Sequence, residues 1–141
     1  MKTYVNSDKN GIRKAILRER NLLVENEIFN KSIKIQEKLM RTSMFLNAKT
    51  VGIYSNIGSE VETNLIKENV LKSNKKLAYP RVVGDSIQFF SIEKNEPGKM
   101  NIEKNRFNLP ELPYNVNNII EFFDLLIIPG IAFDSKGYRI G

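Results

Sequence analysis

The 141-residue chain contains no cysteine and no histidine. The absence of cysteine excludes disulfides, thiol nucleophiles and Cys-based zinc sites, and the absence of histidine removes the commonest general base and metal ligand. Enzymes that depend on a Ser-His-Asp or Cys-His arrangement are therefore excluded. The chemistry that remains must use carboxylates, lysine, arginine, tyrosine, backbone dipoles or a hard metal such as Mg²⁺ held by oxygen atoms. Phosphoryl transfer fits, because it depends on positioning and charge stabilisation more than on a protein nucleophile.

Long apolar runs are also missing. No run approaches the roughly 18 residues of a membrane-spanning helix, and residues 1–7 lack the apolar core of a signal peptide. We therefore expect a cytoplasmic protein that does not bind membranes. The hydrophobic content of 41% and the charged content of 27% are ordinary globular values. A chain of this length supports one domain with a substantial core, so we expect a single α/β domain over residues 1–141, in a monomer.

The net charge of +6 is unevenly distributed. Residues 1–50 hold 11 Lys and Arg against 5 Asp and Glu, which gives +6, whereas residues 51–141 hold 11 of each, which gives zero. An excess of basic residues on the first third of the chain attracts anions. The sign alone does not separate nucleotide, polyglutamate and nucleic acid, and solvated helix faces are the commonest cause of such an excess.

Hydrophobic periodicity and turn residues predict a mixed chain of helices and strands. Residues 93–118 have no regular pattern, residues 119–123 resemble a short helical turn, and Thr63 is a plausible helix N-cap. These elements predict a three-layer α/β sandwich around a mainly parallel sheet, with the two N-terminal helices packed on the sheet. The predicted elements are, in order, a helix at 7–23, a helix at 27–46, a strand at 50–54, a helix from about 63 to 73, and strands at 76–83, 87–92 and 125–128.

The stretch from Asp124 to Gly141 is the most informative part of the chain. Its apolar run from Leu125 to Ile128, closed by Pro-Gly, is typical of a central strand that is covered on both faces. The glycines that follow, spaced among charged residues, predict a polar loop at the carboxyl end of this strand, where open α/β sheets place their ligands. For the two aromatic residues of this loop, Phe133 and Tyr138, packing against the protein is the default expectation.

Two further stretches carry polar residues at suggestive positions. Lys14 and Arg18 lie one helical turn apart, so both cations share one helix face. The turn that contains Ser55 and Glu60 lies between a strand and a helix. Taken alone, the first pattern favours a solvated basic face and the second favours a turn with acidic residues near a helix N-terminus.

Together and in this order, the three stretches resemble the 5-formyltetrahydrofolate cyclo-ligase family, also called methenyltetrahydrofolate synthetases. The C-terminal stretch is similar to the family's buried strand followed by Pro-Gly-x-x-Phe-Asp-x-x-Gly-x-Arg-x-Gly. The run from Lys14 to Arg18 matches the family's Lys-x-x-x-Arg, and residues 54–63 resemble its aromatic-led turn with a carboxylate. The three stretches span nearly the whole chain, which makes the resemblance fairly specific.

The resemblance implies an ATP-dependent C–N ligase of one-carbon metabolism. The reaction would be the ATP- and Mg²⁺-dependent cyclisation of 5-formyltetrahydrofolate to 5,10-methenyltetrahydrofolate, with release of ADP and phosphate. It implies substrate contacts from Arg18, Ser55 and Glu60, and no metal ligand within the chain as given; a catalytic residue is not identified. The ATP-binding residues that it implies are Lys14, Ala15, Ile16, Leu17, Arg18, Arg139, Ile140 and Gly141.

In the family, the final motif continues into a Gly-rich Tyr-Tyr-Asp segment that cradles ATP phosphates. The given sequence stops at Gly141, before such a segment. The resemblance therefore implies that this form is impaired in turnover.

Two alternatives from other functional classes stay open. One is a non-catalytic α/β domain that senses a phosphorylated metabolite without consuming ATP. The other is a nucleic-acid-binding module that uses the basic helices and binds with a steep salt dependence. The second is disfavoured, because no aromatic residue falls between Tyr4 and Phe29, so the Lys14 and Arg18 face has no stacking platform.

Overall fold

A computed structural model describes residues 9–92, 103–104, 110–111 and 115–141. The described helices are α1 (Lys9–Arg20), α2 (Glu25–Met40), α3 (Ser43–Asn47), α4 (Asn64–Lys72) and the 3₁₀ turn η1 (Val116–Asn118). The described strands are β1 (Thr50–Gly52), β2 (Lys76–Val83), β3 (Ser86–Ser91), β4 (Glu103–Lys104), β5 (Pro110–Glu111), β6 (Ile119–Ile120), β7 (Leu125–Leu126), β8 (Ala132–Phe133) and β9 (Arg139–Ile140).

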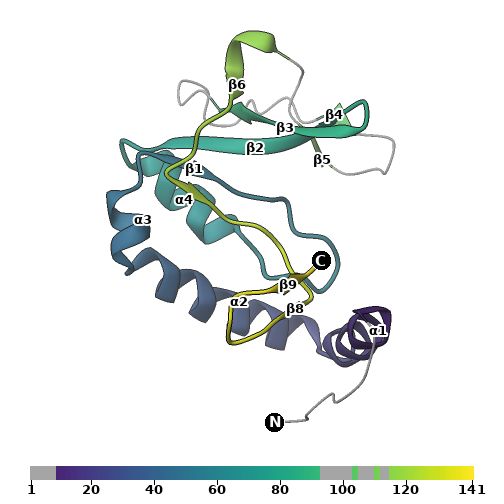
Figure 1. Ribbon diagram of the computed structural model, residues 1–141. Coiled ribbons are helices and arrows are strands. Elements are labelled where there is room, and N and C mark those ends of the chain that lie inside the picture. The colour runs from purple at the N-terminus through teal and green to yellow at the C-terminus, as the bar shows by residue number, and fades with distance from the viewer. Residues whose placement is uncertain (1–8, 93–102, 105–109, 112–114) are drawn as a thin grey trace.

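The central sheet has the order β6-β3-β2-β1-β7 (Figure 1). Strand β1 pairs in parallel with both β2 and β7, and β3 and β6 extend the sheet in antiparallel fashion. The predicted α/β class with its βαβ unit is thus confirmed: α4 connects β1 to β2, and Val51 lies in register with Leu77. Two separate hairpin pairs, β4 with β5 and β8 with β9, complete the described strands.

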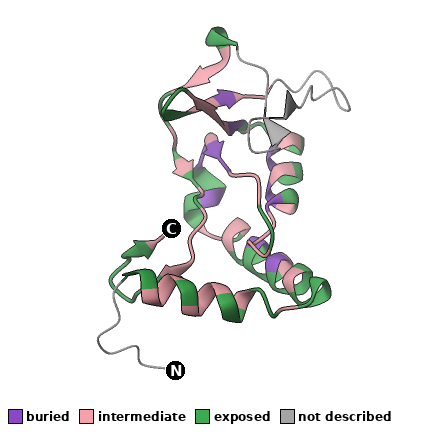
Figure 2. Ribbon diagram, turned by 90° about the vertical axis from the view of Figure 1, so that its right-hand side faces the viewer, coloured by how far each residue is buried: buried purple, intermediate pink, exposed green. Residues whose placement is uncertain are grey.

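One face of the sheet forms the hydrophobic core. Val51 and Ile53 of the β1 segment and Leu77 of β2 are almost fully buried in one cluster. Helices α3 and α4 contribute Phe45 and Val70 to the same cluster, and the end of α2 packs against it. Figure 2 shows the buried residues gathered where the sheet meets these helices. The core therefore fixes the helices against the strands whose carboxyl ends open onto the site described below.

The other face of the sheet is more open. Because residues alternate between faces along a strand, Gly52 and Leu126, which lie in register, point away from the core. The ring of Phe123 reaches across this face to Phe89, with the ring centroids 4.9 Å apart in an edge-to-face arrangement. The prediction that Leu125–Ile128 forms a central strand is wrong: β7 is an edge strand among the described strands, and Leu126 is 41% exposed.

The predicted helix at 27–46 is two helices. α2 ends at Met40, and Thr42 adopts an extended conformation as the N-cap of α3. The Thr42 hydroxyl accepts a hydrogen bond from the N–H of Phe45 at 3.3 Å and donates one to the carbonyl of Leu39 at 2.7 Å. The break was not predicted, because the hydrophobic periodicity continues across it. Thr42 is nevertheless of a residue type that is favoured at helix N-caps.

Three other boundaries differ from the sequence predictions. The residues proposed as the first helix start, 7–8, lie outside the described residues, and α1 ends at Arg20. The helical turn predicted at 119–123 is wrong, because Ile119 and Ile120 pair with β3 as strand β6. The loop predicted after Pro129 contains the hairpin β8–β9. Of the predicted irregular segment 93–118, most lies outside the described residues.

The hairpin owes its turn to two residues of the C-terminal stretch. The Asp134 side chain accepts hydrogen bonds from the N–H groups of Lys136 and Tyr138 at 2.8 and 2.9 Å. Gly137 has φ of 86°, a left-handed conformation that favours glycine. The spacing of Asp and Gly in this stretch is thus a local folding signal. Among the described helices, none is both long enough and apolar enough to cross a membrane.

Candidate functional site

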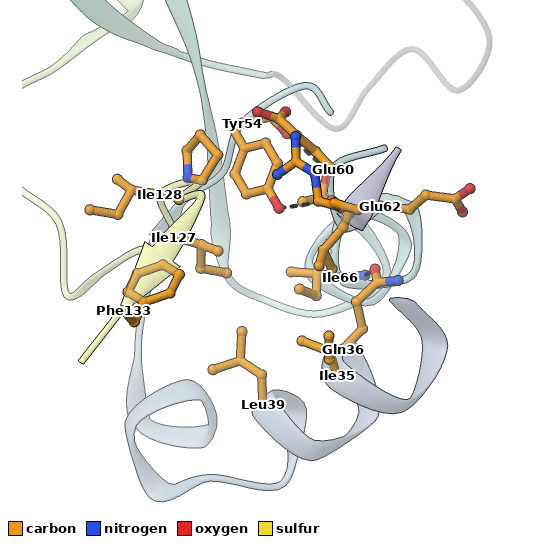
Figure 3. Close-up of a pocket in the computed structure, with 15 residues that line it drawn as sticks. Ile35, Gln36, Leu39, Tyr54, Glu60, Glu62, Ile66, Ile127, Ile128 and Phe133 are labelled. Atoms are coloured by element: carbon orange, nitrogen blue, oxygen red, sulfur yellow. Dashed lines mark hydrogen bonds between the residues drawn. The ribbon is translucent and has the colours of Figure 1, made fainter. Parts of the chain in front are cut away.

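A pocket of about 300 Å³ lies beyond the carboxyl ends of β1 and β7. Four segments line it: the end of α1, the middle of α2, residues 54–66, and residues 127–133 (Figure 3). The predicted place for a ligand, at the carboxyl ends of the parallel strands, therefore contains a pocket.

One rim of the pocket is polar. It contains the phenol of Tyr54, the carboxylate of Glu60 and the guanidinium of Arg20. The Tyr54 hydroxyl donates a hydrogen bond to the Val61 carbonyl at 2.8 Å. Burial, reinforced by the negative charge of Glu60 and opposed by Arg20, raises the pKa of Tyr54 to about 12. Tyr54 is therefore a neutral hydrogen-bond donor at physiological pH.

Glu60 is held by the turn that precedes it. One of its carboxylate oxygens accepts a hydrogen bond from the N–H of Ile57 at 2.8 Å, and its own N–H donates to the Ile57 carbonyl at 3.1 Å. These two bonds fix the carboxylate at the pocket rim while leaving acceptor capacity, because a carboxylate has about four lone-pair sites.

The opposite side of the pocket is apolar. Leu39 of α2 and Ile127, which follows β7, face each other with Phe133 beside them (Figure 3). Phe133 is 65% exposed. A side chain at Gly130 would collide with the Phe133 ring, so glycine is needed there for the ring to reach the pocket. An exposed aromatic face next to aliphatic side chains suits a flat ring system.

The N-terminus of α4 is capped by another helix. Thr63 occupies the N-cap position, as predicted, but its side chain makes no capping bond; its hydroxyl donates to the Tyr54 carbonyl at 2.8 Å. Instead, the side-chain oxygen of Gln36 in α2 accepts from the N–H groups of Leu65 and Ile66 at 3.0 and 3.2 Å. Two of the N–H groups that βαβ units often offer to phosphates are therefore already paired here.

Helix α1 is attached to the pocket region at its C-terminal end. The Arg20 guanidinium donates to the Ser59 hydroxyl at 2.9 Å, and Ser59 donates to the side-chain oxygen of Asn21 at 2.6 Å. In the middle of α1, Arg13 donates to the backbone carbonyl of Gly141 at 2.8 Å. Helix α1 therefore bridges the turn around Glu60 and the C-terminal hairpin.

The structure brings only part of the predicted site together. Glu60 lines the pocket, and Arg139 donates to the carbonyl of the pocket residue Pro129. Lys14 and Arg18 are exposed on α1 and do not line this pocket. The intervening residues 15–17 are half-buried, Ile140 pairs with Ala132 in the hairpin, and Gly141 accepts the bond from Arg13.

Ser55 is directed to a neighbouring tyrosine. It does not line the pocket, and its side chain is hydrogen-bonded to Tyr79, as is that of Thr63. Burial raises the pKa of Tyr79, and these two hydrogen bonds partly oppose the rise. The expected packing of the loop aromatics is also wrong, because Phe133 and Tyr138 are both largely exposed.

Sequence reasoning missed Gln36, Arg20 and Asp124. Ser32 and Gln36 lie four residues apart on the buried side of α2, where two apolar residues would be usual. This polar pair on a buried helix face was the sequence signal that could have identified Gln36. Asp124 begins the C-terminal stretch, and its carboxylate accepts from the N–H groups of Lys49 and Thr50 at 2.9 and 2.7 Å. These two bonds, the one from Thr50 being the stronger influence, lower the pKa of Asp124.

A metal site is not formed by the described residues, which contain no group of three or more Asp or Glu side chains placed to hold an ion. Any Mg²⁺ at this site would depend on ligands such as phosphate oxygens and water, as Mg²⁺ commonly does.

Comparison with known proteins identifies relatives along nearly the whole chain. The model of the 5-formyltetrahydrofolate cyclo-ligase family matches residues 5–141. The 5-formyltetrahydrofolate cyclo-ligase of Mus musculus is 24% identical over 148 residues, covering 97% of this chain and 70% of the mouse protein. The probable 5-formyltetrahydrofolate cyclo-ligase of Schizosaccharomyces pombe is 25% identical, covering 94% of this chain and 66% of its own length.

Solved structures agree. The NMR structure of the Aquifex aeolicus 5,10-methenyltetrahydrofolate synthetase matches with a TM-score of 0.80 and 30% identity, covering 94% of this chain and 66% of that one. The Mycoplasma pneumoniae 5,10-methenyltetrahydrofolate synthetase matches with a TM-score of 0.65 and 26% identity, covering 96% and 71%. The chain thus spans about two thirds of the length of these relatives.

Proposed function

This chain belongs to the 5-formyltetrahydrofolate cyclo-ligase family, and from this premise we propose that its pocket binds a reduced folate for the family's reaction. That reaction is the ATP-dependent cyclisation of 5-formyltetrahydrofolate to 5,10-methenyltetrahydrofolate, with release of ADP and phosphate. The observation that carries the proposal is a pocket with a carboxylate at one rim and an apolar, aromatic wall opposite, at the carboxyl ends of the parallel strands.

The two sides of the pocket suit the two properties of a pterin ring. The ring is flat, so its faces can pack on Phe133 and the aliphatic side chains of Ile127 and Leu39. Its edge carries several N–H groups, which a carboxylate such as Glu60 accepts well. In this arrangement Tyr54 borders the ring as a neutral phenol, whose O–H is donated to the Val61 carbonyl and whose oxygen can still accept a hydrogen bond from the ring.

We propose that ATP lies toward α1 and the C-terminal hairpin. Two observations support this side. At the N-terminus of α4, the N–H groups of Leu65 and Ile66 are bound by Gln36, so these two are not free to bind phosphate. Exposed cations lie on α1, which contacts β8, and include Lys14 and Arg18; Arg139 on β9 is also exposed. Lysine acts as a point charge on phosphate, and arginine offers a planar fork.

ATP would supply a phosphoryl group that turns the formyl oxygen into a leaving group, after which N10 of the folate closes the ring. The protein's part is to hold the reactants in line and to stabilise the charge that develops. Cations at Lys14, Arg18 and Arg139 suit the second task, and the pocket walls suit the first. Neither task requires histidine or cysteine.

The direct test is a spectrophotometric assay for the methenyl product from 5-formyltetrahydrofolate and Mg-ATP, with ATP omitted as the control. We expect ATP-dependent product, and a KM for ATP that rises about tenfold in Lys14→Ala, which corresponds to the loss of one charge-assisted contact. Lys38→Ala is the matched control, because Lys38 is an exposed cation on α2 that does not line the pocket.

Folate binding is measured separately by titration, with Glu60→Gln as the test variant. Weaker binding of 5-formyltetrahydrofolate to this variant supports the role of Glu60. Absence of saturable folate binding to the unaltered chain would contradict the proposed function. Binding of both ligands without product favours the ligand-sensing alternative, which the sequence left open.

A second comparison tests the expectation that this form is impaired in turnover. The 141 residues are compared with a chimera extended by the part of the Aquifex aeolicus protein that they do not match. A faster chimera supports the expectation, and equal rates contradict it.

A further inference from the structure

We infer that Gln36 is a positioning residue that sets the shape of the pocket, by joining the wall formed by α2 to the segment that carries Glu60. Its side chain is 2% exposed and lies at the pocket, although it is on a helix that contributes mainly apolar side chains there. The inference rests on the proposed function only for the identity of the ligand used in the binding test.

The hydrogen bonds of Gln36 link two elements far apart in the sequence. Its side-chain oxygen accepts from the N–H groups of Leu65 and Ile66, at 3.0 and 3.2 Å, in the first turn of α4. Its side-chain nitrogen donates to the carbonyl of Ser32 at 3.2 Å, one turn earlier in α2. The amide group is therefore fixed at both ends, and only a group that both donates and accepts can make all three bonds.

A second bond joins the same two elements. The hydroxyl of Ser32, which is also buried, accepts from the N–H of Glu62 at 3.0 Å. Three N–H groups, those of Glu62 just before α4 and of Leu65 and Ile66 in its first turn, are thus bound by two residues of α2. Glu62 and Glu60 lie in the short segment between these bonds and the end of β1, so the position of Glu60 depends on them.

This arrangement replaces a local cap. A helix N-terminus leaves about four N–H groups without intrahelical partners, and a side chain at the N-cap usually accepts from one of them. Thr63 does not do so; its hydroxyl donates to the Tyr54 carbonyl, and its side chain is also hydrogen-bonded to Tyr79. A cap supplied from a different helix couples the start of α4 to the position of α2, which a local cap would not.

The bonds also affect which part of a ligand the pocket accepts. A helix N-terminus attracts anions through its free N–H groups and the helix dipole. Because the N–H groups of Leu65 and Ile66 are paired with the side chain of Gln36, these two are not available to an anion. The α4 side of the pocket is thereby left suited to an uncharged ring, and an anionic group is better placed elsewhere. Gln36 therefore contributes to the orientation of the ligand as well as to the shape of the pocket.

The test compares two substitutions at position 36. Gln36→Met keeps the length of the side chain and removes all its hydrogen bonds, whereas Gln36→Glu keeps an acceptor for Leu65 and Ile66. The matched control is Gln88→Met, because the side-chain oxygen of Gln88 is buried without a hydrogen-bond partner and lies on β3, outside the pocket lining. Thermal unfolding of each variant shows that it is folded at the temperature of the assay.

We expect Gln36→Met to raise the Kd for 5-formyltetrahydrofolate about tenfold, Gln36→Glu to bind more tightly than Gln36→Met, and Gln88→Met to bind like the unaltered chain. In turnover, the KM for folate should rise while the KM for ATP stays unchanged. Such a split is not expected from a general loss of stability. A folded Gln36→Met variant with unaltered folate affinity would overturn the inference, as would Gln36→Glu binding no better than Gln36→Met.

Amide hydrogen exchange gives a readout that needs no ligand. In Gln36→Met, the amides of Leu65 and Ile66 should exchange faster than in Gln36→Glu, while that of Val70, within α4, changes less. If the unaltered chain fails to bind folate but these amides respond as expected, the proposed ligand is wrong and the linkage of α2 to α4 stands. If folate binds and the amides do not respond, the positioning role is wrong.

Discussion

The two sides of the pocket are built in different ways. The inner wall, formed by α2 and residues 54–66, is tied to the core and joined by hydrogen bonds of buried side chains such as Gln36 and Ser32. The outer wall, formed by residues 127–133 and the hairpin β8–β9, is largely exposed and is held by bonds such as that from Arg13 to Gly141. The inner wall is therefore preformed, whereas the outer wall is the side that can adjust to a ligand.

The largest loss of stability is expected from removing a core side chain on the inner side of the pocket. Phe45 is 2% exposed and belongs to the cluster that joins the helices to β1 and β2. Phe45→Ala should lower the free energy of unfolding by about 3–5 kcal/mol, through lost burial and the cavity left behind.

Phe133→Ala, at a position that is 65% exposed in the outer wall, should lower the free energy of unfolding by less than about 0.5 kcal/mol while weakening folate binding. Urea titration and ligand titration check both, and equal stability losses would contradict the distinction.

A smaller effect is expected at the joint between the two walls. Gly52 lies beside β7, and a Cβ at this position would lie 2.6 Å from the nearest methyl of Leu126 and 3.0 Å from the ring of Phe123. Gly52→Ala should therefore destabilise the fold by about 1–3 kcal/mol through overpacking. Thermal or urea unfolding measures this loss.

The double variant Gly52→Ala, Leu126→Ala is the control for that explanation. Because Leu126 is partly exposed, its truncation alone should be mild, and the double variant should recover part of the stability. Additive losses in this cycle would show that the contact with Leu126 is not the cause.

The loss of folding stability at acid pH tests the hydrogen bonds that attach the start of β7 to β1. The pKa of Asp124 is lowered below the usual value of an aspartate in the folded protein, by hydrogen bonds from the N–H groups of Thr50 and Lys49. The stabilisation from a lowered pKa is fully present above the unfolded-state pKa and is lost as the pH falls through the folded-state pKa. Asp124→Asn should therefore show a shallower loss of stability below about pH 4. Urea unfolding between pH 7 and pH 2 measures it, and parallel curves for the two proteins would contradict it.

The smallest effect on stability is expected in the outer wall itself. Arg13→Gln removes the donor to the carbonyl of Gly141 at an exposed site, so the melting temperature should change by no more than about 1–2 °C. Trypsin cleavage after Lys136 should nevertheless become faster, because the hairpin loses its tie to α1. Lys9→Gln at the start of α1 is the control. Unchanged cleavage would mean that this bond does not restrain the outer wall.

The fold was largely predictable where periodicity and pairing agree. The alternation around Val51 and Leu77, with α4 between them, is sufficient to indicate a parallel βαβ unit. The break at Thr42 and the strand at Ile119 were not predicted, because a short break interrupts no hydrophobic period and two β-branched residues reveal a strand only when a partner strand is present. The edge position of β7 depends on strand order, which its apolar sequence does not contain.

The site was predictable only in part. Glu60 was identified from a resemblance between sequences, and it lines the pocket. Gln36 was missed because its partners, Leu65 and Ile66, lie about 30 residues away, and no local pattern links them. The proposed roles of Lys14 and Arg18 concern exposed side chains, so ligand binding is the test of them.

The bond between Arg13 and Gly141 has a consequence for biosynthesis. The two residues are 128 positions apart, and ribosomes add about 5–20 residues per second. Helix α1 is therefore synthesised roughly 6–26 s before the hairpin against which it packs. During that interval the inner wall can form around α2, β1 and α4. Helix α1 is then a basic, amphipathic segment that has not yet made its contact with the hairpin. The order of translation thus favours completion of the rigid half of the pocket before the half that closes it.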